Sequence, residues 1–464
     1  FIFASVYFIK QNISIMAKIY KYHLSYALVR EYFMFCFKRF YGEYTVTGRE
    51  NIPETGPVIF AANHVNALMD PLAVISVIPR KLPIIYMGRS DMFKGKKFTQ
   101  FLRFIKLVPA FRMRDGIENL EKNKASFEQC DEVLERNLAL GIMPEGNQGS
   151  FRRIRPLVKG IFRIAFKAQQ KYGNSPGVKI VPIGIDYNNL EKFGQKIIIN
   201  IGKPIEVAEY MENYKENEVK AINTIRSRLF KELVNLTVHI SSEKHYYGFE
   251  TATELTSSAV AHQLNLDDKP LNRFHARQKT AQWLNKLEFS DPETAERIDR
   301  LSNNYKKNLK QLHLRDWIFE DKPTSILNIL LSTLGLILTF PIFITGLLLN
   351  VLPFFAPDLV RKIYKIHFPG GLSSLRFVSG MISFPLFYIL QGIYIYKKFE
   401  LNFLSLLFIV PLQYITGKLS FTWYKSFRKL SAKIRYKFPN AKNFELLKET
   451  LDLHSEITGL VQPV

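Results

Sequence analysis

Short apolar runs alternate with longer mixed stretches through the first half of the chain. The apolar runs have the length of buried strands and lie at residues 44–47, 58–62, 84–87, 140–143, 179–185 and 196–201. The intervening stretches predict helices at residues 68–77, 95–105, 119–137 and 158–172. Strands that alternate with helices form βαβ units, so we expect an α/β domain with a mainly parallel sheet flanked by helices.

The second half of the chain follows a different pattern. Residues 212–323 are polar, with few glycines and no long apolar run, and their composition predicts a helical region. Three uncharged apolar runs follow, at residues 324–356, 377–396 and 401–417. Runs of this kind are typical of transmembrane helices, which need about 20 residues each to cross a bilayer.

The first of these runs is long for one span and short for two. Because Pro341 lies near its middle, we expect residues 324–356 to form a hairpin or a re-entrant pair bent at that point. The other two runs would then form an out-and-back hairpin, with residues 397–400 as its turn.

Aromatic and basic side chains are interleaved over residues 17–41. This mixture suits a helix lying in a membrane interface, and a helix packed on the protein core is the alternative. Met16 is the first methionine, so residues 1–15 could lie upstream of the natural start, and we assign them no function. The patterns divide the chain into an N-terminal interfacial region (1–41), an α/β domain (42–211), a polar helical region (212–323), a membrane region (324–417) and a basic tail (418–464).

The chain carries a formal net charge of +23, which favours a polyanionic partner. Nucleic acid and an anionic membrane surface both fit such a charge, and the apolar runs decide for a phospholipid membrane and against nucleic acid. Cys36 and Cys130 are the only cysteines, so no disulfide framework is expected. The nine histidines are scattered and no Cys-x-x-Cys occurs, so we expect no metal site.

Basic residues flank the apolar runs, at residues 306–322, 361–376 and 418–437. Basic flanks favour the cytoplasmic side, so we expect a multi-pass membrane protein whose α/β domain is cytoplasmic. Frequent Lys, Ile, Asn and Phe suggest an AT-rich genome, and with it a bacterial inner membrane.

The stretch VIFAANHVNALMDP, residues 58–71, carries the first candidate for chemistry. His64 follows the predicted strand directly, and a histidine is well suited to accept a proton near neutral pH. Asp70 is its natural partner, since a carboxylate on one ring nitrogen leaves the other free to act as a base. The two are six positions apart, so they can meet only if the chain bends, and Asn66 makes a turn there plausible. Taken alone, a histidine at a strand end is more often structural.

Three further stretches accompany this pair: PAFRMR at residues 109–114, LGIMPEG at residues 140–146 and KIVPIGI at residues 179–185. Together the four stretches resemble, in order, the motif blocks of the glycerolipid acyltransferase family, over about residues 45–210. The family's commonest spacing has four residues between the histidine and the aspartate, whereas this chain has five and resembles a longer variant.

The resemblance implies roles for particular residues. His64 and Asp70 would be catalytic, and His64 and Glu145 both follow predicted strands, so one sheet edge would hold both. The substrate-binding residues would be Arg112, Arg114, Glu145, Gly146 and Lys159. Two arginines that flank one methionine can grip a phosphate dianion. A solvated basic loop is the alternative for these arginines.

One departure from the family pattern follows Gly146. Many family members have Thr-Arg there, and this chain has Asn147-Gln148. Nearby basic side chains could supply the missing positive charge, namely Arg152, Arg153, Arg155 and Lys159.

The resemblance implies a membrane-bound O-acyltransferase of phospholipid biosynthesis. It would transfer a fatty acyl chain from acyl-CoA or acyl carrier protein, as a co-substrate, to glycerol-3-phosphate or a lysophosphatidate-type lipid acceptor. Neither a cofactor nor a metal is expected, because the thiolate of the donor is a good leaving group. A non-catalytic lipid-binding scaffold on the same fold is the alternative. A transporter is a further alternative, but the apolar runs contain none of the ionisable residues that ion-coupled transport usually needs.

Overall fold

The computed structural model describes residues 19–20, 22–80, 82–110, 120–173, 177–320, 324–365 and 369–463. Contacts within the chain group it into two units. The first unit is Phe1–Thr237 with His367–Ser374, and the second is Val238–Ile366 with Leu375–Val464. The first unit therefore includes a short segment from late in the chain.

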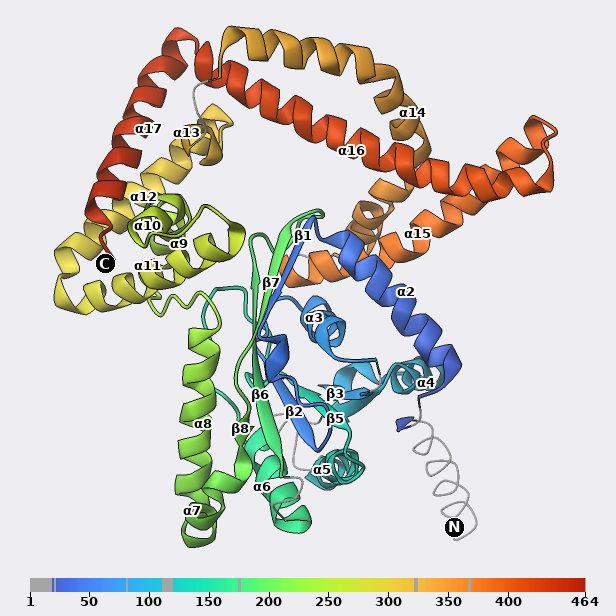
Figure 1. The fold of residues 1–464 in the computed structure, drawn as a ribbon, viewed down its shortest axis with the longest axis vertical. Coiled ribbons are helices and arrows are strands. Elements are labelled where there is room, and N and C mark those ends of the chain that lie inside the picture. Colours follow the sequence, from blue (N-terminus) through green and yellow to red (C-terminus); the bar gives the residue numbers. More distant parts are fainter. Residues whose placement is uncertain are drawn as a thin grey trace. The chain divides into compact units, whose positions relative to one another are not determined.

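An eight-stranded sheet forms the centre of the first unit among the described residues (Figure 1). Its strands are β1 (Glu43–Thr47), β2 (Val58–Ala62), β3 (Ile84–Arg89), β4 (Leu107–Ala110), β5 (Ala139–Ile142), β6 (Lys179–Tyr187), β7 (Lys196–Ile201) and β8 (Ile205–Glu206). The order is β1-β7-β6-β2-β5-β3-β4, with β8 paired to β6. The β6–β7 and β6–β8 pairs are antiparallel and the others are parallel, so the predicted mainly parallel sheet is confirmed.

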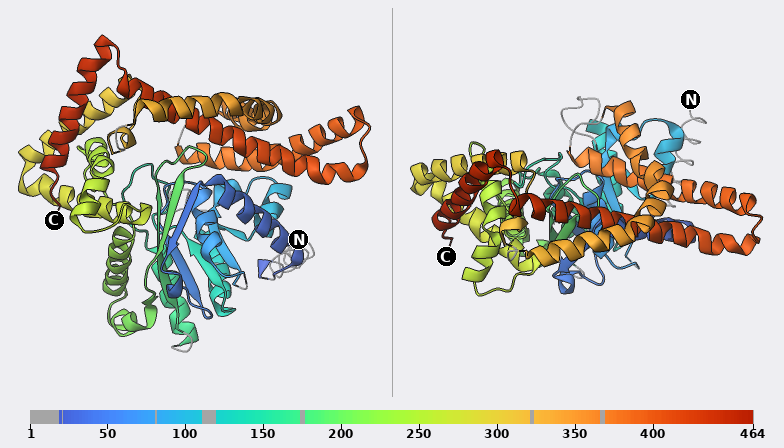
Figure 2. Two further views of the ribbon diagram at one scale, coloured as in Figure 1. Left: turned by 45° about the horizontal axis from the view of Figure 1, so that its top comes forward. Right: turned by 90° about the horizontal axis from the view of Figure 1, so that it is seen from above.

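Helices cover both faces of this sheet, as the views of α3 and α8 show (Figure 2). The helices of the first unit are α2 (Leu24–Phe40), α3 (Met69–Val77), α4 (Lys96–Phe104), α5 (Leu120–Glu135), α6 (Gly160–Tyr172), α7 (Met211–Glu216) and α8 (Glu218–Asn235). Successive side chains of a strand point to opposite faces. On β2, Ile59 and Ala61 accordingly join the core under α5, α6 and α8. All five residues of β2 are buried, as expected for a central strand covered on both sides.

Two strands were not expected from the pattern. β4 is short and, among the described residues, pairs only with β3 at the end of the sheet, a position that tolerates Pro109. β8 has only the two residues Ile205–Glu206. Strands this short carry too few alternations to stand out from a loop.

The polar region predicted at residues 212–323 is divided between the two units, because α7 and α8 belong to the first unit with the sheet. Four α8 residues, Ile222, Ile225, Leu229 and Leu233, are buried in the same core as the strands. The contacts consequently divide the chain after Thr237.

The segment at residues 17–41 divides its aromatic residues between two environments. On α2, Tyr26, Phe37 and Phe40 are buried, whereas Leu28 and Phe35 are exposed. α2 therefore packs on the protein with one side and exposes apolar side chains on another. Its predicted position in a membrane interface stays a prediction.

The second unit is helical in the described residues. Its helices are α9 (Tyr246–Leu255), α10 (Ser257–Gln263), α11 (Pro270–Ser290), α12 (Pro292–Leu312), α13 (Trp317–Glu320), α14 (Ile326–Tyr364), most of α15 (Pro369–Lys398), α16 (Leu406–Lys437) and α17 (Ala441–Leu460). α12 packs against both α9 and α17. The segment predicted as a basic tail therefore contains the end of α16 and a packed helix.

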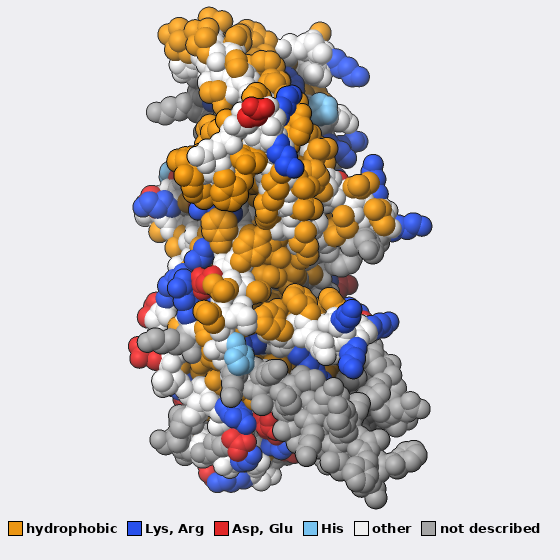
Figure 3. All heavy atoms as spheres, turned by 90° about the vertical axis from the view of Figure 1, so that its right-hand side faces the viewer, with side chains coloured by type: hydrophobic (Ala, Val, Ile, Leu, Met, Phe, Trp, Pro, Cys, Tyr) orange, Lys and Arg blue, Asp and Glu red, His pale blue; other side chains and the backbone are white. Residues whose placement is uncertain are grey.

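Three helices of the described chain, α14, α15 and α16, are long and apolar enough to cross a membrane. Their large apolar side chains are mostly exposed, and Figure 3 shows such side chains gathered on the upper part of one face. A surface of this kind is stable in contact with lipid.

The expected hairpin at residues 324–356 is wrong, because α14 is one helix that continues through Pro341, Pro353 and Pro357. Proline removes a backbone hydrogen bond but need not end a helix in an apolar setting, where nearby hydroxyl groups satisfy freed carbonyls. Pro357 frees the carbonyl of Pro353, four residues earlier, and the hydroxyl of Ser383 donates to that carbonyl at 3.0 Å. Pro353 likewise frees the carbonyl of Leu349, to which Nε2 of Gln391 donates at 3.1 Å.

Candidate active site

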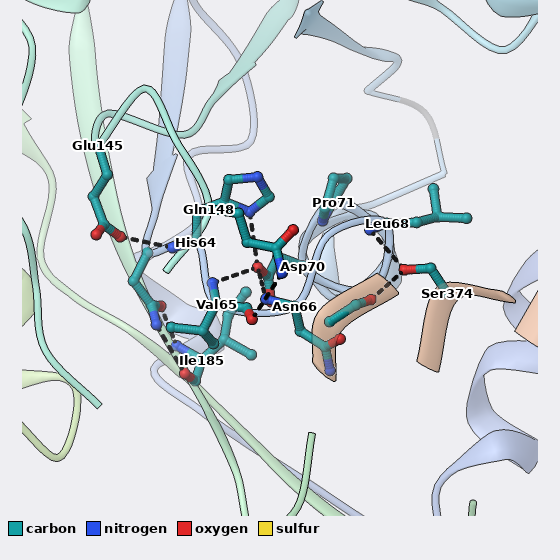
Figure 4. Close-up of polar contacts among 12 residues, drawn as sticks. His64, Val65, Asn66, Leu68, Asp70, Pro71, Glu145, Gln148, Ile185 and Ser374 are labelled. Atoms are coloured by element: carbon teal, nitrogen blue, oxygen red, sulfur yellow. Dashed lines mark hydrogen bonds and ion pairs between the residues drawn. The ribbon is translucent and has the colours of Figure 1, made fainter. Parts of the chain in front are cut away.

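The polar turn between β2 and α3, residues 63–68, brings His64 and Asp70 together (Figure 4). Nδ1 of His64 lies 2.9 Å from Oδ2 of Asp70. Ala67 takes a positive φ of 36°, which folds the chain back within the turn. The bend that the spacing required is therefore present, and it ends as Asp70 enters the first turn of α3.

Asp70 is fully buried and surrounded by hydrogen-bond donors. Its Oδ2 also accepts from the backbone N–H groups of Val65 at 2.8 Å and Asn66 at 2.7 Å. Its Oδ1 accepts from the hydroxyl of Tyr187 at 2.7 Å. Donors of this number offset the cost of burying a carboxylate, and they fix its orientation toward His64.

Tyr187 stays a donor over the whole physiological range. Burial raises its pKa well above the usual range, and the neighbouring Asp70 raises it further. Since a carboxylate can only accept, Nδ1 of His64 carries the proton that it shares with Asp70, and Nε2 has the free lone pair. Within the described residues, Nε2 has no recorded hydrogen-bond partner, and the side chain of His64 is 20% exposed.

The side chain of Asn63 ties the start of the turn to β6. Its Nδ2 donates to the carbonyl of Ile185 at 3.0 Å, and its Oδ1 accepts from the N–H of Ile185 at 2.7 Å. This pair of bonds continues the β2–β6 ladder past the end of β2 and fixes the point where His64 leaves the sheet.

Glu145 lies beside His64 but is held by protein groups. Its Oε1 accepts from the backbone N–H of His64 at 2.7 Å, and its Oε2 accepts from Nε of Arg155 at 2.8 Å and from the Arg155 N–H at 3.1 Å. Burial raises the pKa of Glu145, while the Arg155 charge and the donated hydrogen bonds act against this. The contacts give Glu145 a role in holding the His64 backbone, and substrate binding by Glu145 stays a prediction.

Gly146 and Lys159 belong to the loop between β5 and α6. Gly146 has a φ of 69°, where a side chain is strained, and a Cβ there would lie 3.0 Å from Cγ1 of Val158. Lys159 is the residue directly before α6, makes no side-chain hydrogen bond to the helix N-terminus, and is exposed. The role of Gly146 and Lys159 in substrate binding stays a prediction.

Two of the basic residues suggested as replacements for the missing family arginine are already paired. Arg152 forms an ion pair with Asp186, and Arg155 forms one with Glu145. Their charges are therefore largely balanced within the protein.

Arg112 and Arg114 lie outside the described residues, so the structure says nothing of their positions. β4 ends at Ala110 and runs parallel to β3, which in turn is parallel to β5. Parallel strands have their carboxyl ends at one edge of the sheet, so β4 ends at the edge where His64 follows β2.

Sequence reasoning missed several residues that build this site. Tyr187 lies two residues beyond the predicted strand at 179–185 and ends the observed strand β6, and nothing in its sequence context points to Asp70, which is 117 positions earlier. Ser373 and Ser374 reach the turn from α15, more than 300 positions later. Among the described residues, no group of three or more His, Cys, Asp or Glu side chains could hold a metal ion.

The arrangement can perform general-base chemistry. A buried carboxylate orients a partly exposed imidazole whose second nitrogen has no hydrogen-bond partner among the described residues, as in the histidine–aspartate pairs of acyl-transfer enzymes. A hydroxyl group placed at Nε2 would lose its proton as it attacks a carbonyl carbon.

The comparison with protein families matches residues 43–186 to the family described as Acyltransferase. Among curated proteins, the chain is 23% identical over 334 residues to glycerol-3-phosphate O-acyltransferase 1 of Saccharomyces cerevisiae, covering 66% of this chain and 43% of that protein. It is 27% identical over 203 residues to a 1-acyl-sn-glycerol-3-phosphate acyltransferase of Borreliella burgdorferi, covering 42% of this chain and 72% of that protein. The chain thus spans less than half the length of the yeast relative.

A solved structure is also similar, that of the 1-acyl-sn-glycerophosphate acyltransferase PlsC from Thermotoga maritima. The superposition has a TM-score of 0.33 with 19% identity, and covers 50% of this chain and 91% of that one.

Proposed function

We propose that the protein transfers a fatty acyl chain to a hydroxyl group of a glycerol phosphate lipid precursor. The match of residues 43–186 to the acyltransferase family and the glycerolipid acyltransferases among the curated relatives support this proposal. The observation that carries the proposal is the His64–Asp70 pair, whose Nδ1 to Oδ2 distance is 2.9 Å. Asp70 is fully buried and bonds to an imidazole that is 20% exposed. A buried carboxylate bonded to a partly exposed titratable group is typical of catalytic sites.

In the proposed reaction, Nε2 of His64 takes the proton of the acceptor hydroxyl. The hydroxyl oxygen then forms a bond to the carbonyl carbon of an acyl thioester, and the carbon–sulfur bond breaks. The proton passes from His64 to the leaving thiolate, so the imidazole returns to its starting state. Asp70 keeps Nδ1 protonated and stabilises the imidazolium while it exists.

The proposed acceptors are glycerol-3-phosphate and lysophosphatidate, which both carry a phosphate. The curated relatives include enzymes named for each of these two activities. The proposed donors are acyl-CoA and acyl carrier protein. Arg112 and Arg114 are the proposed phosphate ligands, with Glu145, Gly146 and Lys159 lining the acceptor site.

We place this chemistry at a membrane, with the catalytic domain on the cytoplasmic face of a bacterial inner membrane. Three helices long and apolar enough to cross a bilayer support the membrane part. The basic stretch at residues 306–322, directly before α14, supports the cytoplasmic side.

The test is acyl transfer by membranes that contain the full-length chain, supplied with labelled acyl-CoA or acyl carrier protein and with each acceptor in turn. His64→Ala should lower the rate by about 10²- to 10⁴-fold, because the general base is lost. His262→Ala is the matched control, since His262 is an exposed histidine on α10 of the second unit. Equal measurable rates for the wild type and His64→Ala would overturn the mechanism, whereas no transfer above background by the wild type would favour the lipid-binding scaffold.

A further inference from the structure

The first turn of α15 packs directly on the turn that carries His64. Gly370 and Ser373 are buried there, Ser373 to 1% exposure, and both belong to the same unit as the sheet. The hydroxyl of Ser373 donates to Oδ1 of Asn66, and the backbone N–H of Leu68 donates to the hydroxyl of Ser374 at 3.1 Å. Figure 4 shows Ser374 facing Leu68 at the end of the turn opposite His64.

Gly370 permits this close approach. A Cβ at Gly370 would lie 2.0 Å from Nε2 of Gln148, which would have to move, and 3.1 Å from Cα of Asn66, so even a methyl group would press on the backbone of the turn. Gln148 itself donates to the carbonyl of Val65 at 3.4 Å, and the next residue, Gly149, donates to the carbonyl of His64 at 2.9 Å. The helix therefore touches both segments that fix the His64 backbone.

A short chain of contacts joins α15 to the candidate base. Ser373 holds the side chain of Asn66, and the N–H of Asn66 donates to Oδ2 of Asp70, the same oxygen that faces His64. Asn66 is 1% exposed, so its side-chain oxygen would lose a protein donor without reaching bulk water if Ser373 were removed.

The same helix continues to Lys398 and is one of those long and apolar enough to cross a membrane. Its first turn, however, is polar and glycine-rich, reading GGLSS at residues 370–374. A transmembrane helix needs no buried serines that bond to another domain. Both hydroxyl groups also bond to the carbonyl of Gly370 within the helix, at 3.1 and 2.9 Å. Their bonds to Asn66 and Leu68 are the ones that join the helix to the turn.

We propose that Gly370, Ser373 and Ser374 are positioning residues of the acyl-transfer reaction. They hold the 63–68 turn in the conformation that aims Asp70 at His64, and they act through Asn66 and Leu68. This inference rests on the proposed function, because positioning has a meaning only if His64 acts as the base.

The test uses the full-length protein in membranes and compares the double variant Ser373→Ala/Ser374→Ala with Ser379→Ala. Ser379 is a matched control, because its hydroxyl lies on the same helix and bonds to the carbonyl of Leu375 of that helix. The double variant should lower kcat by about 5- to 30-fold, while the KM values of donor and acceptor change less than about twofold. Ser379→Ala should leave both quantities unchanged.

Hydrogen exchange supplies a readout that does not depend on activity. Peptides covering residues 63–70 should exchange faster in the double variant than in the wild type or Ser379→Ala, because the Val65 and Asn66 amides are less well held on Asp70. Should the wild type transfer no acyl group, the proposed function fails, and the exchange rates alone still decide whether α15 holds the turn.

Two further variants keep the result decisive. Ser374→Thr keeps the hydroxyl at a partly exposed position and should retain most of the activity, whereas Gly370→Ala should lower kcat like the double variant. An unchanged kcat in the double variant, an effect confined to KM, or unchanged exchange at residues 63–70 would each overturn the inference.

Discussion

At the scale of single residues, the site is built around the carboxylate of Asp70. His64, Val65, Asn66 and Tyr187 all donate to it, and its side chain is fully buried. A buried carboxylate with good donors is held in one orientation, and His64 takes its tautomer and ring angle from that orientation. Catalysis at this site should therefore depend on the donors as well as on His64.

Tyr187→Phe should lower kcat about 10-fold with little change in either KM. The variant leaves Oδ1 of Asp70 without its donor at 2.7 Å, and a hydrogen bond to a charged group contributes roughly 1.5–3 kcal/mol. Steady-state kinetics on the membrane-bound enzyme measures this. Tyr44→Phe is the control, because the Tyr44 hydroxyl bonds to Ser76 at 2.6 Å. Similar losses in both variants would mean that Asp70 is not the cause.

Glu145→Gln should alter how stability depends on pH. The folded-state pKa of Glu145 is raised by burial, so the folded protein binds this proton more tightly than the unfolded chain. The wild type should consequently gain stability relative to the variant as pH falls from 7 through that raised pKa, and lose the gain as pH rises again. Thermal unfolding of both proteins across this range checks the sign. An opposite trend would mean that the Arg155 ion pair outweighs burial.

Arg112→Ala and Arg114→Ala should mainly raise the KM of the acceptor. Losing one charged hydrogen bond to the phosphate should raise it about 10- to 100-fold, with a smaller effect on the donor. Lys220→Ala, an exposed charge on α8, controls for the loss of one positive charge. A rise confined to the donor KM would reassign the two arginines to the CoA or carrier-protein site.

At the scale of elements, α14, α15 and α16 are joined by polar side chains within an apolar surface. Asn350 donates to the carbonyl of Gln413 at 3.2 Å, and Gln413 donates to Gln391 at 3.0 Å. Gln391 in turn donates to the carbonyl of Leu349 at 3.1 Å. Lipid offers no hydrogen bonds, so helices in a bilayer associate through such contacts and through small residues that allow close approach.

Gly417→Leu should weaken the packing of α14 on α16. A Cβ at Gly417 would lie 2.5 Å from Oδ1 of Asn350, so the larger side chain forces the helices apart at a cost of about 1–3 kcal/mol. Gly335→Leu is the matched control, because a Cβ there meets nothing within 4 Å. Unfolding in detergent should show a lower melting temperature only for Gly417→Leu. Equal melting temperatures would show that this contact does not hold the helices together.

At the scale of the whole molecule, the chain combines an α/β domain with long apolar helices. The exposed large hydrophobic side chains are concentrated in α14, α15 and α16, where water would be unfavourable. One segment of α15, residues 370–374, nevertheless groups with the sheet. Under the proposals made above, one helix both anchors the protein in the membrane and supports the site.

The full-length protein should stay in the membrane fraction in high salt and at alkaline pH. We expect the three helices that are long and apolar enough to cross a bilayer to insert in the hydrocarbon, whereas α2 alone would offer only a limited apolar strip and positive charge. Extraction of membranes followed by centrifugation measures this, with a peripheral protein of the same membranes as the control. Release by alkaline carbonate would contradict the transmembrane assignment.

The parts of the site that could be predicted are those whose residues lie close together in the sequence. The five-residue strand before His64 and the turn that brings Asp70 back could be predicted from the sequence. The apolar run, the turn residue and the spacing that indicate them all lie within residues 58–71. The role of Glu145 could be predicted only in part from the sequence. Its position at a strand end was readable, but its hydrogen bond to the N–H of His64 joins residues 81 positions apart.

The sequence by itself determined the α/β class, the positions of most strands along the chain, the histidine–aspartate pair and the presence of late helices long and apolar enough to cross a membrane. Periodicity, charge and apolar length act over a few neighbouring residues, so they can be read along the chain. Only the tertiary structure decided that α14 continues through Pro341, that Tyr187 donates to Asp70 and that α15 reaches the turn beside His64. These outcomes depend on which distant side chains find each other in the packed state, and a single sequence carries no local mark of such pairing.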